Sequence, residues 1–580
     1  MGKKSIKGNP WDFLDEYRGS VFKGRWPTIP QMFDITTTRY PDNRCFTSFS
    51  PKEITFSYKE AREKCLQLAD YLIEAGVTKE TKVAVTGKNS IEWTIAYLAV
   101  LYANAIVVPL DYQLSDKEID FLLDFAEVKF LFTDIERFNS FGNSENIVEK
   151  FALEEGGENY LLTKKAKKKQ KNNQAKEDDL AAILFTSGTT GNPKGVMLTH
   201  SNLVSDCYLA QKHLSVYPSD VFYALLPIHH SYTMLAVFIE AISVGSEIVF
   251  GKKLIVSQIL KELKQGKVTM FLAVPMLFNK MLRGLMNGIK EKGVLVYGLI
   301  RALMSISGLI KKVFKVNPGK KMFNGILAKL SMDNIRICIS GGGPLPSSTF
   351  KLFNQLGVDF VQGYGLTETS PIITLNPIDA YIETSVGKIL PETEMKILNP
   401  DSRNIGEIAV RGPMVMQGYY KNQEATDEVL DKDGWLHTGD AGYIDANNYV
   451  YLTGRQKSLI VTEGGKNVFP EEIEDLFQLY DEIEQICVLG YIEDKKNLTE
   501  AIRAIIYPSD NFVEGTKKSY PDASELEKAI FDHMQLIIDK VNKDLLPYKR
   551  IMRLTIAKEP MEMTSTKKIK RHIVAKKYEQ

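Results

Sequence analysis

Cysteine is scarce in this chain, and no cysteine is placed for pairing or for metal binding. The 580 residues include five, with no CxxC pair and no histidine at a zinc-ligand spacing: Cys45, Cys65, Cys207, Cys338 and Cys487. This scatter excludes a disulfide framework and a structural zinc site. A reducing compartment fits such a chain best.

The chain also lacks a large net charge and an apolar run near its N-terminus. The 73 Lys and Arg residues balance 72 Asp and Glu residues, which leaves a formal charge of +1, so no nucleic-acid partner is expected. The first residues, MGKKSIKGNPWDF, are basic but lack the apolar stretch of a secretory signal. We therefore expect a cytoplasmic protein.

The spacing of apolar runs predicts the fold class. Short β-rich runs at residues 82–86, 105–110 and 129–133 alternate with helix-like segments such as residues 91–103. This alternation is typical of an α/β fold in which buried parallel strands are covered by helices.

The length predicts more than one domain, because 580 residues exceed the size at which one hydrophobic core stops growing. Beyond residue 455 the chain becomes more charged, and alternating strands and helices begin a smaller unit. We expect a large α/β domain over residues 1–455 and a small α+β domain over residues 456–580.

A lysine-rich stretch, KKAKKKQKNNQAK, occupies residues 164–176. Its composition cannot bury enough apolar area to offset the entropy of ordering, so we expect a flexible surface loop. The alternative is a dock for anionic lipid or nucleic acid, although basic runs are usually only solvated.

A strongly apolar stretch, GVLVYGLIRALMSISGLI, occupies residues 293–310 between lysines at 290, 292, 311 and 312. A membrane span would place Arg301 in the middle of the bilayer, which disfavours it. Two other interpretations remain: a helix buried in the protein, or an amphipathic helix in the membrane interface with its lysines at the lipid headgroups. The latter would make the protein peripheral at the inner face of the membrane.

The segment ILFTSGTTGNPKGVMLTH, residues 183–200, leads from an apolar strand into a loop rich in Ser, Thr and Gly. Its glycines let the backbone approach an anion, while its hydroxyls and the ammonium of Lys194 supply hydrogen-bond donors. This chemistry suits a nucleoside triphosphate, yet the Walker pattern G-x-x-x-x-G-K-[ST] is absent from the chain. A merely flexible loop is the alternative.

This loop resembles the signature TSGTTGxPKGV of the adenylate-forming superfamily, which includes acyl-CoA synthetases, luciferases and peptide-synthetase adenylation domains. Further family signatures follow in the family's order: QGYGLTET at residues 362–369, GWLHTGD at 434–440 and YLTGRQK at 451–457. The resemblance runs from about residue 30 to the C-terminus. It implies a large N-terminal adenylate-forming domain of layered sheets and helices and a small, mobile C-terminal α+β domain.

The resemblance implies that ATP is bound by several loops. The adenine would lie on the glycines of SGGGP, with the ring of Tyr364 stacked on the base, unless Tyr364 is simply a packed core tyrosine. Asp440 would accept hydrogen bonds from the ribose hydroxyls, and Arg455 would reach ribose or phosphate. The implied nucleotide-binding residues are Thr186, Ser187, Gly188, Thr189, Thr190, Gly191, Lys194, Gly341, Gly342, Gly343, Pro344, Gln362, Gly363, Tyr364, Gly365, Thr367, Asp440 and Arg455.

Metal and catalytic roles follow from the same resemblance. Glu368, assisted by Thr189, would hold Mg²⁺ through hard oxygen ligands, against the simpler alternative of a helix cap. His230 in LPIHHSY would stand at the mouth of the acyl and thiol channels, or be a structural histidine. Lys568 occupies the place of the family's catalytic lysine.

The segment that carries this lysine, MTSTKKIKR, departs from the family pattern KTPTGKIxR, because Lys567 stands where glycine is usual. Two adjacent lysines are therefore candidates, of which the alignment favours Lys568. The thiol arm of coenzyme A would meet Gly464, Gly465 and Lys466, a stretch that is otherwise an exposed turn. Ser458 falls at the expected hinge of the small domain.

The implied reaction has two steps. A carboxylate attacks the α-phosphate of MgATP to give acyl-adenylate and pyrophosphate, and a thiol then displaces AMP. Because no carrier domain follows Lys568, free coenzyme A is the expected acceptor. LPIHHSY, LIVTEGGKNVFPEEIE and the apolar stretch near residue 300 look most like bacterial long-chain fatty acyl-CoA synthetases.

Other functions stay open beside a long-chain fatty acid–CoA ligase. Acyl-carrier-protein synthetases and medium-chain or aromatic acid–CoA ligases share these signatures and differ in the residues that line the acyl site. A catalytically silent nucleotide-binding module would require the loss of Lys194, Glu368, Asp440 or the terminal lysine, and all four are present.

Overall fold

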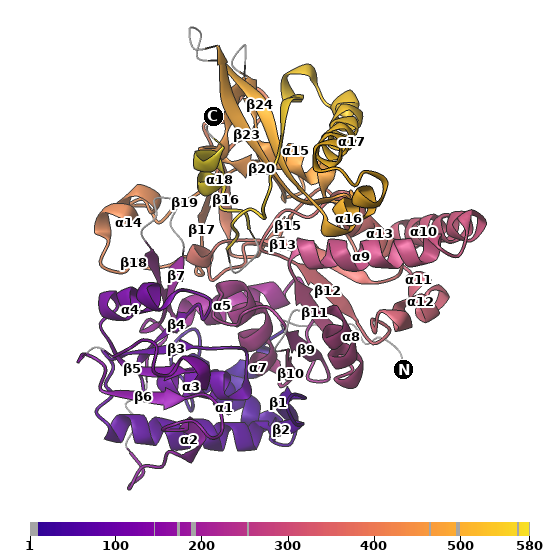
Figure 1. The fold of residues 1–580 in the computed structure, drawn as a ribbon. Helices are drawn as coiled ribbons and strands as arrows, with labels where there is room; N and C mark the ends of the chain where they lie inside the picture. Colours follow the sequence, from indigo (N-terminus) through magenta and orange to yellow (C-terminus); the bar gives the residue numbers. More distant parts are fainter. Residues whose placement is uncertain are drawn as a thin grey trace.

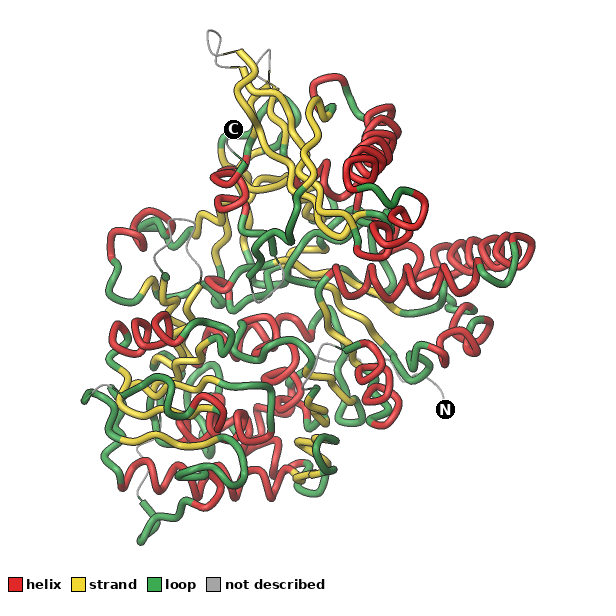
Figure 2. The backbone as a smooth tube through the Cα atoms, in the orientation of Figure 1, coloured by secondary structure: helices red, strands yellow, loops and turns green. Residues whose placement is uncertain are grey.

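Three β-sheets and the helices that cover them make up the protein (Figure 1). The computed structural model describes residues 10–143, 145–170, 175–186, 193–251, 255–462, 466–494, 499–564 and 568–578. Figure 2 shows helices and strands alternating through the lower part of the molecule and a separate group of strands above it. The predicted α/β fold class is confirmed.

The first sheet has seven strands in the order β18-β8-β7-β4-β3-β5-β6. The strands are β3 Lys82–Thr86, β4 Ile106–Leu110, β5 Val128–Thr133, β6 Glu149–Ala152, β7 Leu180–Thr186, β8 Lys194–Thr199 and β18 Gly418–Tyr419. From β6 to β7 the neighbours are parallel, whereas β8 runs antiparallel to both β7 and β18. The three β-rich runs of the sequence are thus adjacent parallel strands of this mixed sheet.

The second sheet has thirteen strands in the order β16-β17-β19-β20-β15-β14-β13-β12-β11-β9-β10-β1-β2. The strands are β1 Arg44–Ser48, β2 Ile54–Ser57, β9 Val221–Ala224, β10 Glu247–Phe250, β11 Met270–Ala273, β12 Ile337–Ser340, β13 Asp359–Tyr364, β14 Thr374–Leu375, β15 Gly387–Ile389, β16 Glu394–Leu398, β17 Gly406–Arg411, β19 Leu436–Ile444 and β20 Tyr449–Arg455. It is parallel from β1 to β13 and antiparallel from β13 to β16.

Helices fill the space around these two sheets. Their bounds are η1 Asp12–Glu16, α1 Ile29–Arg39, α2 Tyr58–Glu74, α3 Ile91–Tyr102, α4 Asp116–Phe125, η2 Ile135–Arg137, η3 Leu161–Thr163, α5 His200–Gln211, α6 Ser231–Thr233, η4 Met234–Ile239, α7 Glu240–Val244, α8 Val256–Gln265, α9 Pro275–Lys290, α10 Val294–Phe314, α11 Gly319–Met322, α12 Asn324–Lys329, α13 Ser347–Gln355, η5 Thr367–Thr369 and α14 Gln423–Val429. Capping boxes at Thr28, Ser57, Ser115 and Thr199 fix where four of them begin, because each side chain accepts a backbone N–H that the helix leaves unpaired.

A third sheet belongs to the C-terminal part, with the order β22-β21-β24-β23 and β25 paired to β24. Its elements are η6 Gln456–Ser458, β21 Ile460–Thr462, β22 Lys466–Val468, α15 Pro470–Glu474, η7 Asp475–Phe477, β23 Ile483–Asp494, β24 Thr499–Pro508, α16 Asp510–Ser519, α17 Ala523–Asp544, η8 Pro547–Lys549, β25 Ile551–Ile556 and α18 Arg571–Lys577. It has its own apolar core, in which Phe477, Val488 and Ile538 are buried. Figure 1 shows this yellow part seated above the larger one.

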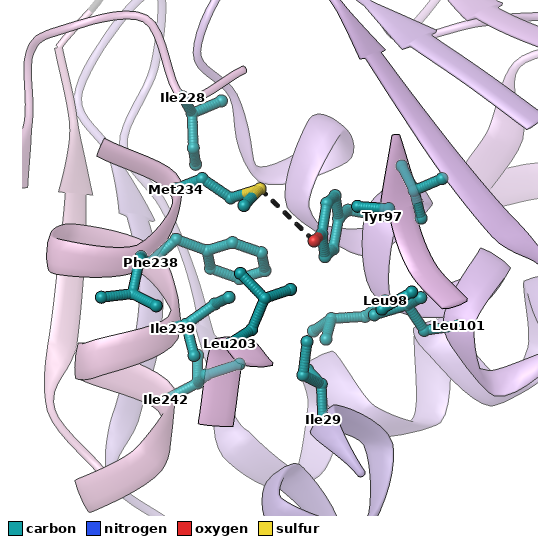
Figure 3. Close-up of a cluster of buried hydrophobic side chains, with 14 of the residues drawn as sticks. Ile29, Tyr97, Leu98, Leu101, Leu203, Ile228, Met234, Phe238, Ile239 and Ile242 are labelled. Atoms are coloured by element: carbon teal, nitrogen blue, oxygen red, sulfur yellow. Dashed lines mark hydrogen bonds between the residues drawn. The ribbon is translucent and has the colours of Figure 1, made fainter. Parts of the chain in front are cut away.

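The core between the two large sheets surrounds the helical run that follows His230. Figure 3 shows Met234, Phe238 and Ile239 facing α3, where the hydroxyl of Tyr97 donates to the sulfur of Met234 at 3.4 Å. This run, η4, is a π-helix, and every residue of it is buried. Because π-helical turns are rare and often adjoin functional sites, η4 draws attention to the loop before it.

Glu240, the first residue of α7, is a buried carboxyl group in this core. Its Oε2 accepts a hydrogen bond from Gln211 Nε2 at 2.6 Å, and burial raises its pKa to about 8. In the unfolded chain the pKa lies near 4.5. Between these values the folded protein keeps a proton that the unfolded chain has lost, so stability must fall as the pH rises.

Replacing Glu240 by glutamine removes this cost while keeping an oxygen that accepts from Gln211. We expect Glu240→Gln to raise the free energy of unfolding by about 2–4 kcal/mol near pH 8 relative to the natural protein, and by much less near pH 5. Denaturant unfolding at the two pH values measures this. The exposed Glu514, replaced in the same way, should show no such pH dependence, and an equal effect of both variants would contradict the assignment.

The lysine-rich stretch lies against the protein over its described residues. The backbone N–H of Lys167 donates to Glu74 at 2.7 Å, that of Gln170 to Asp70 at 3.2 Å, and Gln67 donates to the carbonyl of Lys164 at 2.6 Å. These contacts tie residues 164–170 to α2, whereas residues 171–174 lie outside the described residues. The expected loop is therefore a surface segment anchored by carboxylates.

The apolar stretch near residue 300 forms α10. Among the described residues α10 alone has the length and composition to cross a membrane, and 17% of its apolar window is buried. The interpretation as a buried helix is therefore wrong for most of its length.

Candidate active site

Lys194 is the first residue of β8. It is paired in register with Thr186, the last residue of β7, whose hydroxyl donates to the carbonyl of Lys194 at 3.4 Å. The connecting residues 187–192 lie outside the described residues, so the predicted contacts of Ser187, Gly188, Thr189, Thr190 and Gly191 remain predictions. The hairpin fixes both ends of the predicted phosphate loop.

Tyr419 connects this lysine to the predicted metal ligand. It lies on β18, which pairs with β8, and its ring centre is 4.8 Å from Lys194 Nζ. Its hydroxyl donates to Glu368 Oε1 at 2.8 Å. Among the described residues no hydrogen bond or ion pair engages the other carboxylate oxygen of Glu368, so this oxygen is a candidate ligand for a hard cation.

Glu368 is placed by the turn that follows β13. It lies in η5, and its backbone carbonyl accepts the N–H of Met416 at 2.9 Å. Gly365 allows this turn, because a Cβ there would lie 1.5 Å from the carbonyl oxygen of Pro371. The neighbouring Thr367 shares a hydrogen bond of 3.1 Å with Ser231. The turn is therefore joined to the loop that carries His230.

Asp440 and Arg455 face one another on the antiparallel strands β19 and β20. The guanidinium Nε of Arg455 lies 2.8 Å from Asp440 Oδ1, and the hydroxyl of Tyr364 donates to Oδ2 at 2.7 Å. Burial and the charge of Asp440 raise the pKa of Tyr364 well above its usual value, so the phenol stays protonated and donates. Each carboxylate oxygen can accept a second hydrogen bond, as a ribose would require.

Tyr364 is half-buried and packs against the apolar core, as expected of a core tyrosine, and its stacking on adenine stays a prediction. It is a packing tyrosine whose hydroxyl orients Asp440. Gln362, two residues earlier, is buried on β13 opposite Ser340 of β12, and Gly363 follows it. The strand thus brings QGYG beside the end of β12.

The glycines of SGGGP follow β12. Gly341 lies against the ring of Tyr232, where a Cβ would approach to 2.9 Å, and Gly342 has φ +79°, a conformation that favours glycine. Gly343 has open space around it, with Pro275 3.8 Å from a Cβ position. Pro344 then leads to α13. The role of this loop in binding the base stays a prediction.

Lys568 reaches the same site from the C-terminal part. A bridge between Met563 and Ile569 and a hydrogen bond of 2.8 Å from Thr564 N–H to the Lys568 carbonyl form a small hairpin. Lys568 remains solvent-accessible, but the surrounding protein withdraws enough water to lower its pKa. The charge of Arg455 lowers the pKa further, and that of Asp440 raises it. Lys568 therefore lies within electrostatic reach of the Asp440–Arg455 pair.

Arg571 anchors the hairpin. Its two terminal nitrogens lie 2.8 and 2.9 Å from the two carboxylate oxygens of Glu474 on α15, and Nη1 also donates to the carbonyl of Val488 at 2.6 Å. Such a bidentate pair fixes direction as well as distance. Arg571, which ends the MTSTKKIKR segment, thus positions Lys568.

His230 follows a loop that Asn89 holds in place. The Asn89 amide donates to the carbonyls of Ala224 and Leu226 at 2.9 and 2.8 Å and accepts the N–H of Ile228 at 3.0 Å. Burial, together with His229 and the charge of Lys568, lowers the pKa of His230 to about 3, although Asp111 acts in the opposite direction. The imidazole of His230 is therefore neutral at physiological pH.

His229 is buried beside His230, with ring centres 4.3 Å apart and Nε2 3.5 Å from an oxygen of Asp111. Asp111 directly follows β4. The pair gives the loop a carboxylate partner that the sequence did not indicate. We infer that His229 and Asp111 help to hold His230 in position.

The expected thiol-binding stretch is described only at Lys466. Lys466 is exposed at the start of β22, and its carbonyl accepts from Thr462 at 3.2 Å. Gly464 and Gly465 lie outside the described residues. Within the described residues, no hydrogen bond or ion pair joins Lys466 to another predicted site residue. The CoA-binding role of Lys466 therefore stays a prediction.

Together these side chains have the charges that a site for a polyanion and its cation would need. Lys194, Arg455 and Lys568 supply three positive charges, while Glu368 and Asp440 supply the oxygens for a cation and for hydroxyl groups. The sequence missed Tyr419, Asp111 and Asn89, because single aromatic or polar residues outside a motif carry no signal. Arg571 stood in a quoted motif but without a role.

The comparisons with known proteins agree with this geometry. A family model described as AMP-binding enzyme matches residues 33–420. A chloroplastic long-chain-fatty-acid–acyl-carrier-protein ligase of Arabidopsis thaliana is 27% identical over 96% of this chain and 86% of that protein. A long-chain-fatty-acid–CoA ligase of Mycobacterium bovis is 27% identical over 90% of each chain.

A solved structure has the same architecture. ATP-bound MatB from Rhodopseudomonas palustris superposes with a TM-score of 0.74 at 23% identity, over 95% of this chain and 99% of that one. The likeness spans both the large layered part and the small α+β part, and it confirms the expected two-part fold.

Proposed function

Because the chain belongs to the AMP-binding enzyme family, we propose that it activates a long-chain fatty acid as acyl-adenylate and passes the acyl group to coenzyme A. The observation that carries this proposal is the placement of Asp440 beside Arg455 and of Tyr419 between Lys194 and Glu368, with the charges of Arg455 and Asp440 acting on Lys568. ATP and Mg²⁺ are the implied cosubstrate and metal, and AMP and pyrophosphate the products besides the thioester.

In the first step the carboxylate attacks the α-phosphate, and negative charge spreads over the phosphate oxygens. Lys568 places a positive charge where this charge develops, and Lys194 binds the departing phosphates. Asp440 holds the ribose, with its carboxylate already oriented by Tyr364 and Arg455. Neutral His230 excludes water from the acyl side without adding a competing charge.

The residues of the site fit a magnesium ion. Glu368 would hold it through the oxygen that Tyr419 leaves open, with Thr189 as the second candidate ligand. When bound, Mg²⁺ neutralises phosphate charge and orients the leaving pyrophosphate.

In the second step the small domain reorients. We take residues 1–455 and 456–580 as the two moving units, with Ser458 in η6 as the hinge between β20 and β21. Rotation about this hinge withdraws Lys568 and brings Gly464, Gly465 and Lys466 to the thiol arm. One site thereby serves both half-reactions.

The choice of acid and of acceptor rests on the relatives. Ligases for long-chain fatty acids stand among them with either coenzyme A or acyl carrier protein as acceptor, and the acyl-carrier-protein synthetase remains the second candidate. A medium-chain or aromatic acid is the further alternative. The silent nucleotide-binding module lacks support, since Lys194, Glu368, Asp440 and Lys568 are all present.

We also propose that the enzyme acts in the cytoplasm and contacts the inner face of the membrane without spanning it. α10 has the length to cross a bilayer, but part of it is packed on the protein, and its buried Lys311 is bonded to Asp359 at 2.8 Å. A lipophilic substrate gives such contact a purpose.

The proposal is tested by the products. Purified protein is incubated with MgATP and acids from acetate to hexadecanoate and benzoate, with coenzyme A or acyl carrier protein, and AMP and thioester are followed by mass spectrometry. We expect AMP and a thioester of coenzyme A from long-chain acids. Thioester on the carrier protein alone would favour the second candidate, and the absence of nucleotide turnover would refute the proposed function.

A further inference from the structure

α10 exposes its apolar side chains instead of burying them. Five large residues along the helix are between 51% and 90% exposed: Leu295, Leu299, Ile306, Leu309 and Val313. With Ala302 between them, they recur at alternating intervals of four and three residues, so they share one face of the helix. Figure 1 shows α10 extending to the right, away from the sheets. We name this face the apolar stripe.

The opposite face holds α10 on the protein. Met304, Ser307 and Lys311 are buried at intervals of three and four residues, and α10 packs on α13 and α9. The ammonium of Lys311 bonds to Asp359 at 2.8 Å and to Asn354 at 2.7 Å. The ion pair of the buried Lys311 with the half-buried Asp359 makes the orientation costly to reverse, because breaking it would leave the Lys311 charge unpaired in the protein. The apolar stripe is therefore held outward.

Basic residues border the apolar stripe, and α10 contains no acidic residue. Exposed lysines stand at both ends and on the adjoining helices: Lys290, Lys292, Lys312, Lys315, Lys321 and Lys329. Lys292 lies so close to Lys329 that this lysine lowers the pKa of Lys292. Such crowding of like charge is relieved by an anion.

The charges distinguish between two occupants of this face. In a second copy of the chain, packed stripe to stripe, the lysine-bordered ends would meet one another, and α10 would offer no acidic partner. The acidic residues beside these ends are Glu291 and Glu383, of which Glu383 already pairs with Lys312 at 3.6 Å. Anionic lipid headgroups instead complement the lysines, while the acyl region receives the apolar side chains. The combination of stripe and lysine border fits a lipid surface.

We propose that the apolar stripe of α10 and its lysine border dock the enzyme on an anionic lipid membrane, with the helix lying in the interface plane. This inference names the surface behind the peripheral position proposed above and rests on that part of the proposed function. It does not depend on the adenylation chemistry.

Vesicle co-sedimentation of the full chain tests the proposal. Vesicles of phosphatidylcholine with about one part in three of phosphatidylglycerol should bind the protein, and phosphatidylcholine alone should bind it about tenfold less. Raising the salt should release the protein, since surface charges are then screened. Equal binding to both vesicles, or to neither, would overturn the proposal.

Two variants measure the contributions of the apolar stripe and of its lysine border to vesicle binding separately. Replacing Leu295, Leu299 and Leu309 by glutamine should lower the partition coefficient at least about tenfold, because three apolar side chains no longer enter the lipid. Replacing Lys290, Lys292 and Lys312 by glutamine should lower it by about tenfold or more and weaken the salt dependence. Unchanged binding in the leucine variant would contradict the proposal.

Matched controls carry the same changes elsewhere. Leu536 and Met552 are as exposed, at 67% and 66%, and their replacement by glutamine should leave binding unchanged. Exposed Lys517, Lys518 and Lys528 serve for the charge variant. Sedimentation equilibrium tests whether a second copy of the chain covers the apolar stripe. If the natural protein binds no vesicles but forms a dimer that the leucine variant abolishes, the occupant is a second copy and the lipid proposal is wrong.

The catalytic proposal is assayed on the same proteins. All variants should form AMP from a dissolved acid at the natural rate, since none alters the candidate active site. Vesicle binding by a protein that activates no acid would refute the proposed chemistry and leave this inference standing. Activity without vesicle binding would do the reverse.

Discussion

Replacing Lys568 by alanine is expected to slow acyl-adenylate formation by about 10²–10³-fold while leaving thioester formation from supplied acyl-adenylate nearly unchanged. The charge of Lys568 acts in the first half-reaction, where Arg455 and Asp440 lie within its electrostatic reach. The proposed rotation removes it from the site in the second half-reaction. Single-turnover assays of the two half-reactions measure the effects separately.

Lys567 provides the matched control for this experiment. It adjoins Lys568 and carries the same side chain, but the alignment with the family pattern places it where glycine is usual. Lys567→Ala should change adenylation by less than about threefold. An equal loss in both half-reactions for Lys568→Ala, or a larger loss for Lys567→Ala, would contradict the assignment.

Replacing Glu368 by glutamine is expected to lower the rate of adenylation by about 10²-fold and to raise the Mg²⁺ concentration needed for half of the maximal rate. Glutamine keeps the size of the side chain and an oxygen that accepts from Tyr419, so the variant removes the charge alone. The rate is measured as a function of Mg²⁺ at fixed ATP.

Tyr419→Phe is the companion variant, since it keeps the carboxylate and removes the hydroxyl that orients it. We expect a loss of about tenfold with a smaller shift in the Mg²⁺ requirement, as for one hydrogen bond to a charged group. A Mg²⁺ requirement that is the same in Glu368→Gln and in the natural protein would rule out Glu368 as the metal ligand.

The sequence predicts the parts of the site that lie in motifs, because their spacing along the chain survives folding. Gly365 illustrates this: the turn admits no side chain, so the motif that contains it also fixes where Glu368 lies. Asp440 and Arg455 were predicted separately, and the pairing of β19 with β20 sets them side by side. The antiparallel register, rather than either motif, makes the ion pair.

Contacts between distant segments could not be predicted in this way. Tyr419 meets Lys194 and Glu368 only because β18 pairs with β8, more than 200 residues earlier in the chain. Arg571 meets Glu474 across a domain whose internal packing leaves no local pattern. Both contacts arise from tertiary structure.

The orientation of α10 could not be predicted from the sequence either. An apolar helix with lysines at its ends has the same sequence pattern whether its apolar face is buried or exposed. Lys311 decides the matter, since its bond to Asp359 turns the side with Met304 and Ser307 toward the protein. Only the structure shows that Asp359, at the start of β13, is the partner.

The most direct test of the central claim is acid-dependent exchange of labelled pyrophosphate into ATP, measured with Mg²⁺ and without any thiol. Exchange reports formation and reversal of the acyl-adenylate, so it does not depend on the acceptor. The account predicts strong exchange with hexadecanoate, weak exchange with acetate or benzoate, and a loss of about 10²-fold or more in Lys568→Ala. No exchange with any acid would contradict the account, and exchange with benzoate alone would contradict the long-chain substrate.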